Sequence, residues 1–256
     1  MLFHEWHGNK NKSAPVMVVS AGLGGKGAFW TPQFETLSST FRILSYDQLG
    51  TGQSKGEIPE GYSVHDMALE VLDLLDDQNI TQASFMGHAF GALVGLELAR
   101  IAPDRIDKLI IAGGWIAPDI QTRKCFELRL SILEHCGASD FLKAQPLFLF
   151  PADWLSSHAE ELEQKHRQAV EHFPGKTPVI RRIDALRSFD STPWISSIEH
   201  KTLVITARDD LLVPWTASEA LAKALPNGQF ECLDYGGHAC SVTESDAFNQ
   251  RLTHFL

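Results

Sequence analysis

The chain has 256 residues, of which 44% are hydrophobic and 21% charged, a balance typical of an ordinary globular protein. These proportions exclude a disordered chain and a coiled coil. Because 22 lysines and arginines stand against 32 aspartates and glutamates, the net charge is −10, and nucleic acid is not expected as a partner.

Two further features bear on localisation. Residues 1–12 contain no apolar run, so we expect no signal peptide, and no stretch approaches the ~20 apolar residues of a membrane helix. The four cysteines form neither a CxxC pair nor a zinc spacing, and we expect buried or half-buried free thiols in a reducing cytoplasm. They are Cys125, Cys136, Cys232 and Cys240.

Short β-branched segments alternate with helix-like segments, a pattern typical of a parallel sheet with crossover helices. This pattern predicts an α/β fold. The predicted strands are residues 16–20, 41–47, 83–87, 108–112, 203–206 and 229–233. The predicted helices around them are residues 64–78, 92–101, 217–224 and 245–255.

The alternation stops between residues 115 and 194, where only helix-like segments occur. We therefore expect residues 1–114 and 195–256 to form the core and residues 115–194 to form an inserted helical cap. Such a cap would lie over the carboxyl ends of the strands, where parallel sheets bind ligands. The predicted cap helices are residues 122–135, 138–148, 159–172 and 178–189.

The segment Gly87-His88-Ala89-Phe90-Gly91 follows a predicted strand and precedes a predicted helix. Two glycines around such a turn are typical of the nucleophile elbow of hydrolases, G-x-S-x-G, with Ala89 in the place of the serine. Since alanine cannot form an acyl-enzyme, covalent catalysis at position 89 is excluded. A helix that starts at Phe90 would still present free backbone N–H groups to a small anion.

Three other segments complete the pattern. Leu23 lies in a glycine-rich turn after the first strand, so its N–H and that of Phe90 are candidates for an oxyanion hole, beside Ala89. Asp210 and His238 follow the last two predicted strands. The chain order of elbow, acid and histidine is that of α/β hydrolases.

Over essentially its whole length the chain resembles the α/β-hydrolase superfamily and, more narrowly, the pyrimidine-utilisation D (RutD) family. The segments that carry this resemblance are residues 21–25, 87–95, 145–154, 209–214 and 235–240, and the segment 145–154 within the predicted cap is the most diagnostic. Two residues depart from the superfamily pattern: Ala21 replaces a histidine and Leu49 replaces an arginine.

The resemblance implies an α/β hydrolase of uracil catabolism that acts on carbamate, a small molecule. We expect this hydrolase to be cytoplasmic and to use neither a cofactor nor a metal. It also implies that Ala89 is native and that Asp210, rather than Asp209, is the acid. We expect a noncovalent mechanism in which Leu23 and Phe90 bind the carboxylate and Asp210 fixes the tautomer of His238. His238 would then protonate the nitrogen or activate water.

Several alternatives remain open. The chain could act on aminoacrylate, be a serine esterase or amidase with Ser→Ala at the elbow, or bind a ligand without turnover. His88 could line the pocket or pack beneath the cap, and Ser241 is a weaker candidate nucleophile. The cap histidines have no ligand spacing, and a homodimer is neither predicted nor excluded. These histidines are His158, His166 and His172.

Overall fold

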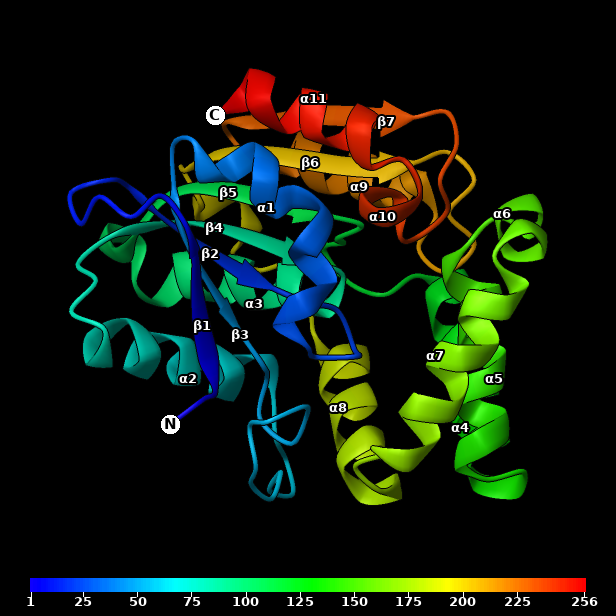
Figure 1. Ribbon diagram of the computed structural model, residues 1–256. Helices are drawn as coiled ribbons and strands as arrows, with labels where there is room; N and C mark the ends of the chain where they lie inside the picture. Colours follow the sequence, from blue (N-terminus) through cyan, green and yellow to red (C-terminus); the bar gives the residue numbers. More distant parts are fainter.

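The computed structural model describes residues 1–256, and its centre is a single seven-stranded sheet (Figure 1). The strand order is β1-β3-β2-β4-β5-β6-β7, and all neighbours are parallel except β1 and β3. This confirms the predicted mostly parallel sheet. The strands are β1 (His4–Gly8), β2 (Val16–Ser20), β3 (Arg42–Tyr46), β4 (Ala83–His88), β5 (Ile106–Ala112), β6 (Lys201–Ala207) and β7 (Gly228–Leu233).

Strand β1 was not expected from the sequence. Its residues, HEWHG, contain one apolar side chain and no apolar run. It lies at the edge of the sheet, pairs antiparallel with β3, and is half-buried or exposed along its length. An edge strand that buries so little apolar area gives no hydrophobic signal in the sequence.

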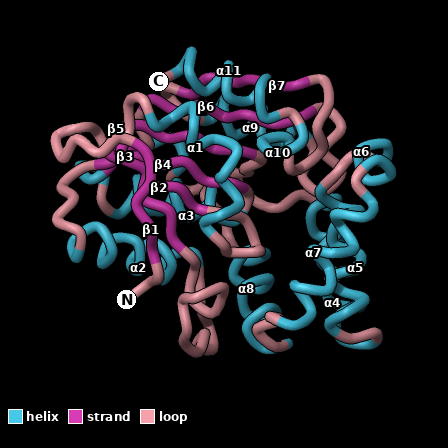
Figure 2. Tube along the Cα trace, viewed as in Figure 1, coloured by secondary structure: helices cyan, strands magenta, loops and turns pink.

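Helices cover both faces of the sheet (Figure 2). In β2, Met17 and Val19 pack in one cluster with α1 and α11, whereas Val18 packs in the other cluster with α2, α3 and α9. Side chains that alternate between the two faces are typical of a strand buried on both sides. The flanking helices are α1 (Thr31–Ser38), α2 (Val64–Asp77), α3 (Phe90–Ile101), α9 (Trp215–Ala224), α10 (Cys240–Thr243) and α11 (Ser245–Phe255).

Five helices lie between β5 and β6 in the chain, and we call them the cap helices. Figure 1 shows them on the side of the molecule toward which β6 and β7 point. The separation of the chain into a core domain and a cap domain stays a prediction. The cap helices are α4 (Ile120–His135), α5 (Ala138–Leu149), α6 (Ala152–Ser157), α7 (Ala159–Glu171) and α8 (Lys176–Ser188).

All four cysteines are free. Cys125 and Cys240 are buried and Cys232 is half-buried, but the expectation is wrong for Cys136, which is exposed. Cys136 directly follows the last residue of α4, so its side chain lies in the turn between two cap helices rather than on a packed face. None of the helices combines the length and the apolar character that a membrane crossing requires.

Candidate active site

The turn between β4 and α3 has the backbone geometry of an elbow. Ala89 is held at φ 47° and ψ −109°, a sparsely populated positive-φ conformation that costs a non-glycine residue on the order of 1–3 kcal/mol. A Cβ atom on Gly91 would lie 2.5 Å from the carbonyl oxygens of Ser20 and Ala21, and one on Gly87 would collide with the Gly91 carbonyl. The two glycines are therefore required for the close approach of β2, β4 and α3.

Two backbone N–H groups are available beside the elbow. Phe90 is the first residue of α3, and the first N–H groups of a helix have no acceptor within the helix. Leu23 lies in the turn after β2, and its N–H makes no hydrogen bond within the protein. The two candidate donors for an oxyanion hole are thus uncommitted.

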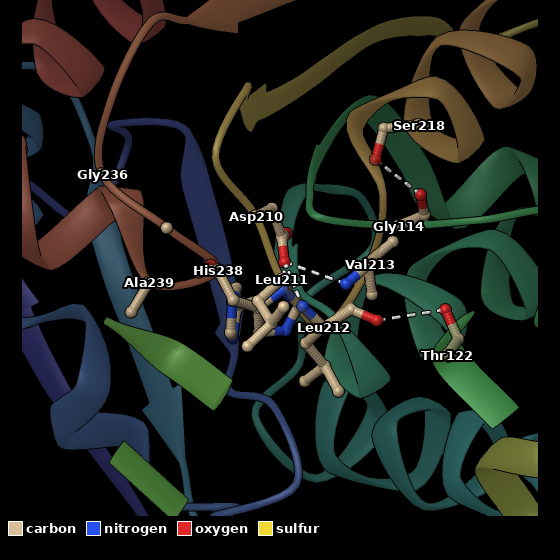
Figure 3. A network of polar contacts seen from close by, with 12 residues as sticks. Gly114, Thr122, Asp210, Leu211, Leu212, Val213, Ser218, Gly236, His238 and Ala239 are labelled. Carbon is tan, nitrogen blue, oxygen red and sulfur yellow. Dashed lines mark hydrogen bonds and ion pairs between the residues drawn. The ribbon is translucent and has the colours of Figure 1, made fainter. Parts of the chain in front are cut away.

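His238 and Asp210 form a buried pair (Figure 3). The Nδ1 atom of His238 lies 2.8 Å from Oδ2 of Asp210, and each side chain is only 1% exposed. The other carboxylate oxygen, Oδ1, accepts hydrogen bonds of 2.9 Å from the N–H groups of Leu212 and Val213. Because the carboxylate accepts from Nδ1, Nε2 is the nitrogen that His238 has free for chemistry.

Asp209 supports the loop that carries the histidine. Its carboxylate accepts hydrogen bonds from the N–H groups of Gly237, at 2.9 Å, and Gly236, at 3.3 Å. The two adjacent aspartates therefore have different tasks: Asp210 contacts the imidazole, and Asp209 contacts the backbone just before it.

His88 directly precedes the elbow residue Ala89 and contacts His238. Its Nε2 donates to the backbone carbonyl of His238 at 2.9 Å, and its ring stacks on Phe29 with centroids 4.6 Å apart. Burial, with a smaller effect from the neighbouring His238, lowers the pKa of His88 to about 3. His88 is therefore neutral near pH 7, and its unprotonated Nδ1 has no partner.

A cavity of about 310 Å³ joins these groups, a size suited to a small ligand. Leu23, Ala89 and His238 line it from the core, together with His88. Ser241 does not line it, although its buried hydroxyl lacks a partner. The cap helices contribute Phe126, Arg129, Gln145, Leu149 and Leu186.

The predicted site residues differ in how they meet the cavity. The backbone of Phe90 adjoins Ala89, while its side chain is fully buried beneath the guanidinium of Arg182. His172 borders a second cavity of about 260 Å³. No three histidine, cysteine, aspartate or glutamate side chains lie together in a way that could hold a metal ion.

The fold and the site together define an α/β hydrolase whose elbow residue is alanine. The family model described as the alpha/beta hydrolase fold matches residues 15–244. Among solved structures, the enol-lactonase from Burkholderia xenovorans LB400 is similar, with a TM-score of 0.90 at 26% identity. That alignment covers 99% of this chain and 95% of the enol-lactonase.

Relatives that align over nearly their full length show which family of α/β hydrolases the chain belongs to. The RutD proteins of Serratia proteamaculans and Agrobacterium fabrum, named as candidate carbamate hydrolases, are each 45% identical to this chain over 255 residues. The alignments cover all of this chain and 96% and 98% of those proteins. The chain belongs to the RutD family of α/β hydrolases.

Sequence reasoning did not identify two buried arginines of the cap helices, Arg129 and Arg182, as site residues. Arg129 lines both cavities, and Arg182 donates a hydrogen bond of 3.1 Å to the carbonyl of Leu23. No motif marks either arginine, and the other arginines of the same helices, Arg123, Arg181 and Arg187, are exposed or half-buried.

Proposed function

We propose that this protein promotes the hydrolysis of carbamate to ammonia and carbon dioxide by a noncovalent route. The observation that carries the proposal is the buried His238–Asp210 pair beside an elbow that retains its strained geometry but carries Ala89. The names of the RutD relatives support carbamate as the substrate. The resemblance to that family supports uracil breakdown as the source of the carbamate.

The proposed mechanism uses only groups of this chain. The N–H groups of Leu23 and Phe90 bind a carboxylate oxygen, since preorganised donors stabilise negative charge well in a dry site. His238, as imidazolium, transfers the proton on Nε2 to the carbamate nitrogen. The C–N bond of the resulting zwitterion breaks, its electron pair leaves with ammonia, and carbon dioxide remains. His238 then regains a proton from solvent, while Asp210 keeps the ring in place.

His238→Ala is expected to abolish any acceleration of carbamate decay, because it removes the Nε2 group that donates the proton in this mechanism. General acid catalysis contributes about 10²–10⁴-fold in rate, so the loss should be at least about 100-fold. The measurement is the decay of freshly prepared carbamate near neutral pH with the wild type, with the variant and with no protein.

His254→Ala is the matched control, since His254 is exposed on α11 and lines neither cavity. Carbamate should decay at the same rate with this variant as with the wild type. Equal rates for the wild type and His238→Ala would overturn the mechanism, and no acceleration by the wild type at high protein concentration would overturn carbamate as the substrate.

The intact elbow also fits a serine esterase or amidase with alanine at the nucleophile position. On the carbamate proposal, Ala89→Ser should change carbamate decay less than about tenfold, because the side chain at position 89 takes no part in the reaction. Ester hydrolysis should stay slow and show no burst. The measurement is release of p-nitrophenol from p-nitrophenyl acetate in the first turnovers, and a stoichiometric burst followed by fast turnover would favour the esterase.

A further inference from the structure

Arg129 lies in the middle of α4, on the face that points toward the core, and is only 2% exposed. Its guanidinium lies over the rings of Phe126, Phe141 and Phe148, at 5.1, 5.4 and 5.7 Å from their centroids. No carboxylate lies within ion-pair distance of it. A buried positive charge in this chain therefore has aromatic neighbours but no counterion.

The hydrogen-bonding groups of Arg129 are also unused. Its Nε and Nη2 are buried and have no acceptor. The other fully buried arginine, Arg182, donates to the carbonyls of Leu23 and Leu49 and to the side-chain oxygen of Gln48. Buried donors without acceptors are costly, and aromatic rings attract a cation without satisfying its N–H groups.

The two cavities meet at Arg129. Five residues line both: Leu23, Gly24, Lys26, Arg129 and Gln145. Neither cavity has an aspartate or a glutamate in its lining, although the protein as a whole carries a charge of −10. The charged side chains that line the two cavities, Lys26, Arg129 and Arg182, are all basic, so the local field favours an anion.

No group of the protein neutralises the charge of Arg129. Burial lowers the pKa of Arg129 to about 10, so the guanidinium is still charged near pH 7. Cys125, one turn earlier on α4, is the nearest group that could carry a negative charge, but burial raises the pKa of its thiol and keeps it neutral.

We propose that Arg129 is the anion-binding residue of the catalytic cavity and that its guanidinium binds the carboxylate group of the substrate. A planar guanidinium matches a carboxylate in two parallel hydrogen bonds, and a bound carboxylate would satisfy donors that the protein leaves free. The inference rests on the proposed function, because it assigns a carboxylate-bearing substrate to the same cavity. It adds a specificity residue from the cap helices to the donors of the core.

Acetate and acetamide test this assignment, since they have the same number of heavy atoms and only acetate is charged. Isothermal titration calorimetry on the wild type should show acetate binding and no acetamide binding. Arg129→Met keeps the length and packing of the side chain without its charge. It should weaken acetate binding at least about 30-fold, as expected when one partner of a buried charged pair is removed. Arg123→Met, an exposed arginine on the same helix, should bind acetate like the wild type.

Thermal unfolding separates binding from a structural role. If Arg129 binds a ligand, Arg129→Met should melt at or above the melting temperature of the wild type when acetate is absent from both. The reason is that the variant no longer buries a charge without a counterion. Acetate should raise the melting temperature of the wild type but not that of the variant. A variant that melts well below the wild type and keeps its affinity for acetate would overturn the inference, as would a wild type that binds neither probe.

The same measurements distinguish this inference from the proposed function. Acetate has no C–N bond, so its binding does not depend on carbamate turnover. Arg129-dependent acetate binding without any carbamate acceleration would overturn the proposed function and leave the anion site. Carbamate acceleration that Arg129→Met leaves at the wild-type rate would overturn the anion site and leave the proposed function.

Discussion

Asp210→Ala should lower the free energy of unfolding by about 3–5 kcal/mol, the usual cost of removing one partner of a buried pair. The change leaves Nδ1 of His238 without an acceptor, and it also leaves the N–H groups of Leu212 and Val213 unpaired in the interior. The activity that depends on His238 should fall by about 10²–10⁴-fold, because nothing then fixes the tautomer or the orientation of the ring. Urea unfolding and carbamate decay measure the two effects.

Asp210→Asn separates stability from chemistry. Its amide oxygen can still accept from the N–H groups of Leu212 and Val213, so most of the stability should be retained. Its amide nitrogen, however, is a donor and faces Nδ1 of His238, so it cannot accept from a protonated Nδ1 and disfavours the imidazolium that donates the proton. We therefore expect a folded protein with little activity. A variant that retains wild-type activity would show that the pair only supports the fold.

Asp209→Ala is the control for the loss of an adjacent carboxylate. Asp209 accepts from the backbone of Gly236 and Gly237 but is exposed, so its removal should cost only about 1 kcal/mol. We expect a larger loss for Asp210→Ala because the His238–Asp210 pair is buried. Equal losses in free energy of unfolding for Asp209→Ala and Asp210→Ala would contradict that explanation.

The sequence specifies the fold best where apolar periodicity is strong. The helix predicted over residues 245–255 coincides with α11 (Ser245–Phe255), and the strand predicted over residues 16–20 coincides with β2 (Val16–Ser20). The short helices α1 and α6 and the edge strand β1 were missed. Each buries too little apolar surface to produce a clear period.

Parts of the candidate site are predictable for a different reason. Leu23, Ala89, Asp210 and His238 each follow a strand, and the carboxyl ends of parallel strands meet at one edge of the sheet, so their proximity follows from the topology. Arg129 depends instead on how α4 packs on the core. In the segment Arg123-Lys124-Cys125-Phe126-Glu127-Leu128-Arg129, the first arginine is exposed and the last is buried, and helical spacing alone does not decide which faces the cavity.

Arg182 connects the cap helices to the turn that carries Leu23, so its replacement should have the second large effect on stability. From α8 it donates to the carbonyl of Leu23 at 3.1 Å, to that of Leu49 at 3.5 Å, and to the side-chain oxygen of Gln48. Gln48 in turn donates to the carbonyl of Ala21 at 2.7 Å. Two turns that follow neighbouring strands, β2 and β3, are therefore held by one guanidinium.

Arg182→Met should lower the free energy of unfolding by about 2–4 kcal/mol, because it leaves buried carbonyl and amide oxygens without donors. Arg187→Met, on the same helix, should change it by less than about 0.5 kcal/mol, since its ion pair with Glu127 is long, at 3.9 Å, and partly exposed. Urea unfolding of the two variants measures the difference, and equal midpoints would contradict the role given to Arg182.

A lower free energy of unfolding alone would not identify Arg182 as the residue that positions the turn carrying Leu23. If it holds this turn both directly at Leu23 and through Gln48 at Ala21, the variants Arg182→Met and Gln48→Met should not be additive in stability, and the coupling should reach about 1 kcal/mol or more. The folded fraction of Arg182→Met should also have a lower kcat for carbamate, because the N–H of Leu23 would no longer hold the carboxylate in the position from which the nitrogen reaches His238. Additive stabilities together with an unchanged kcat would mean that Arg182 only packs α8 against the core.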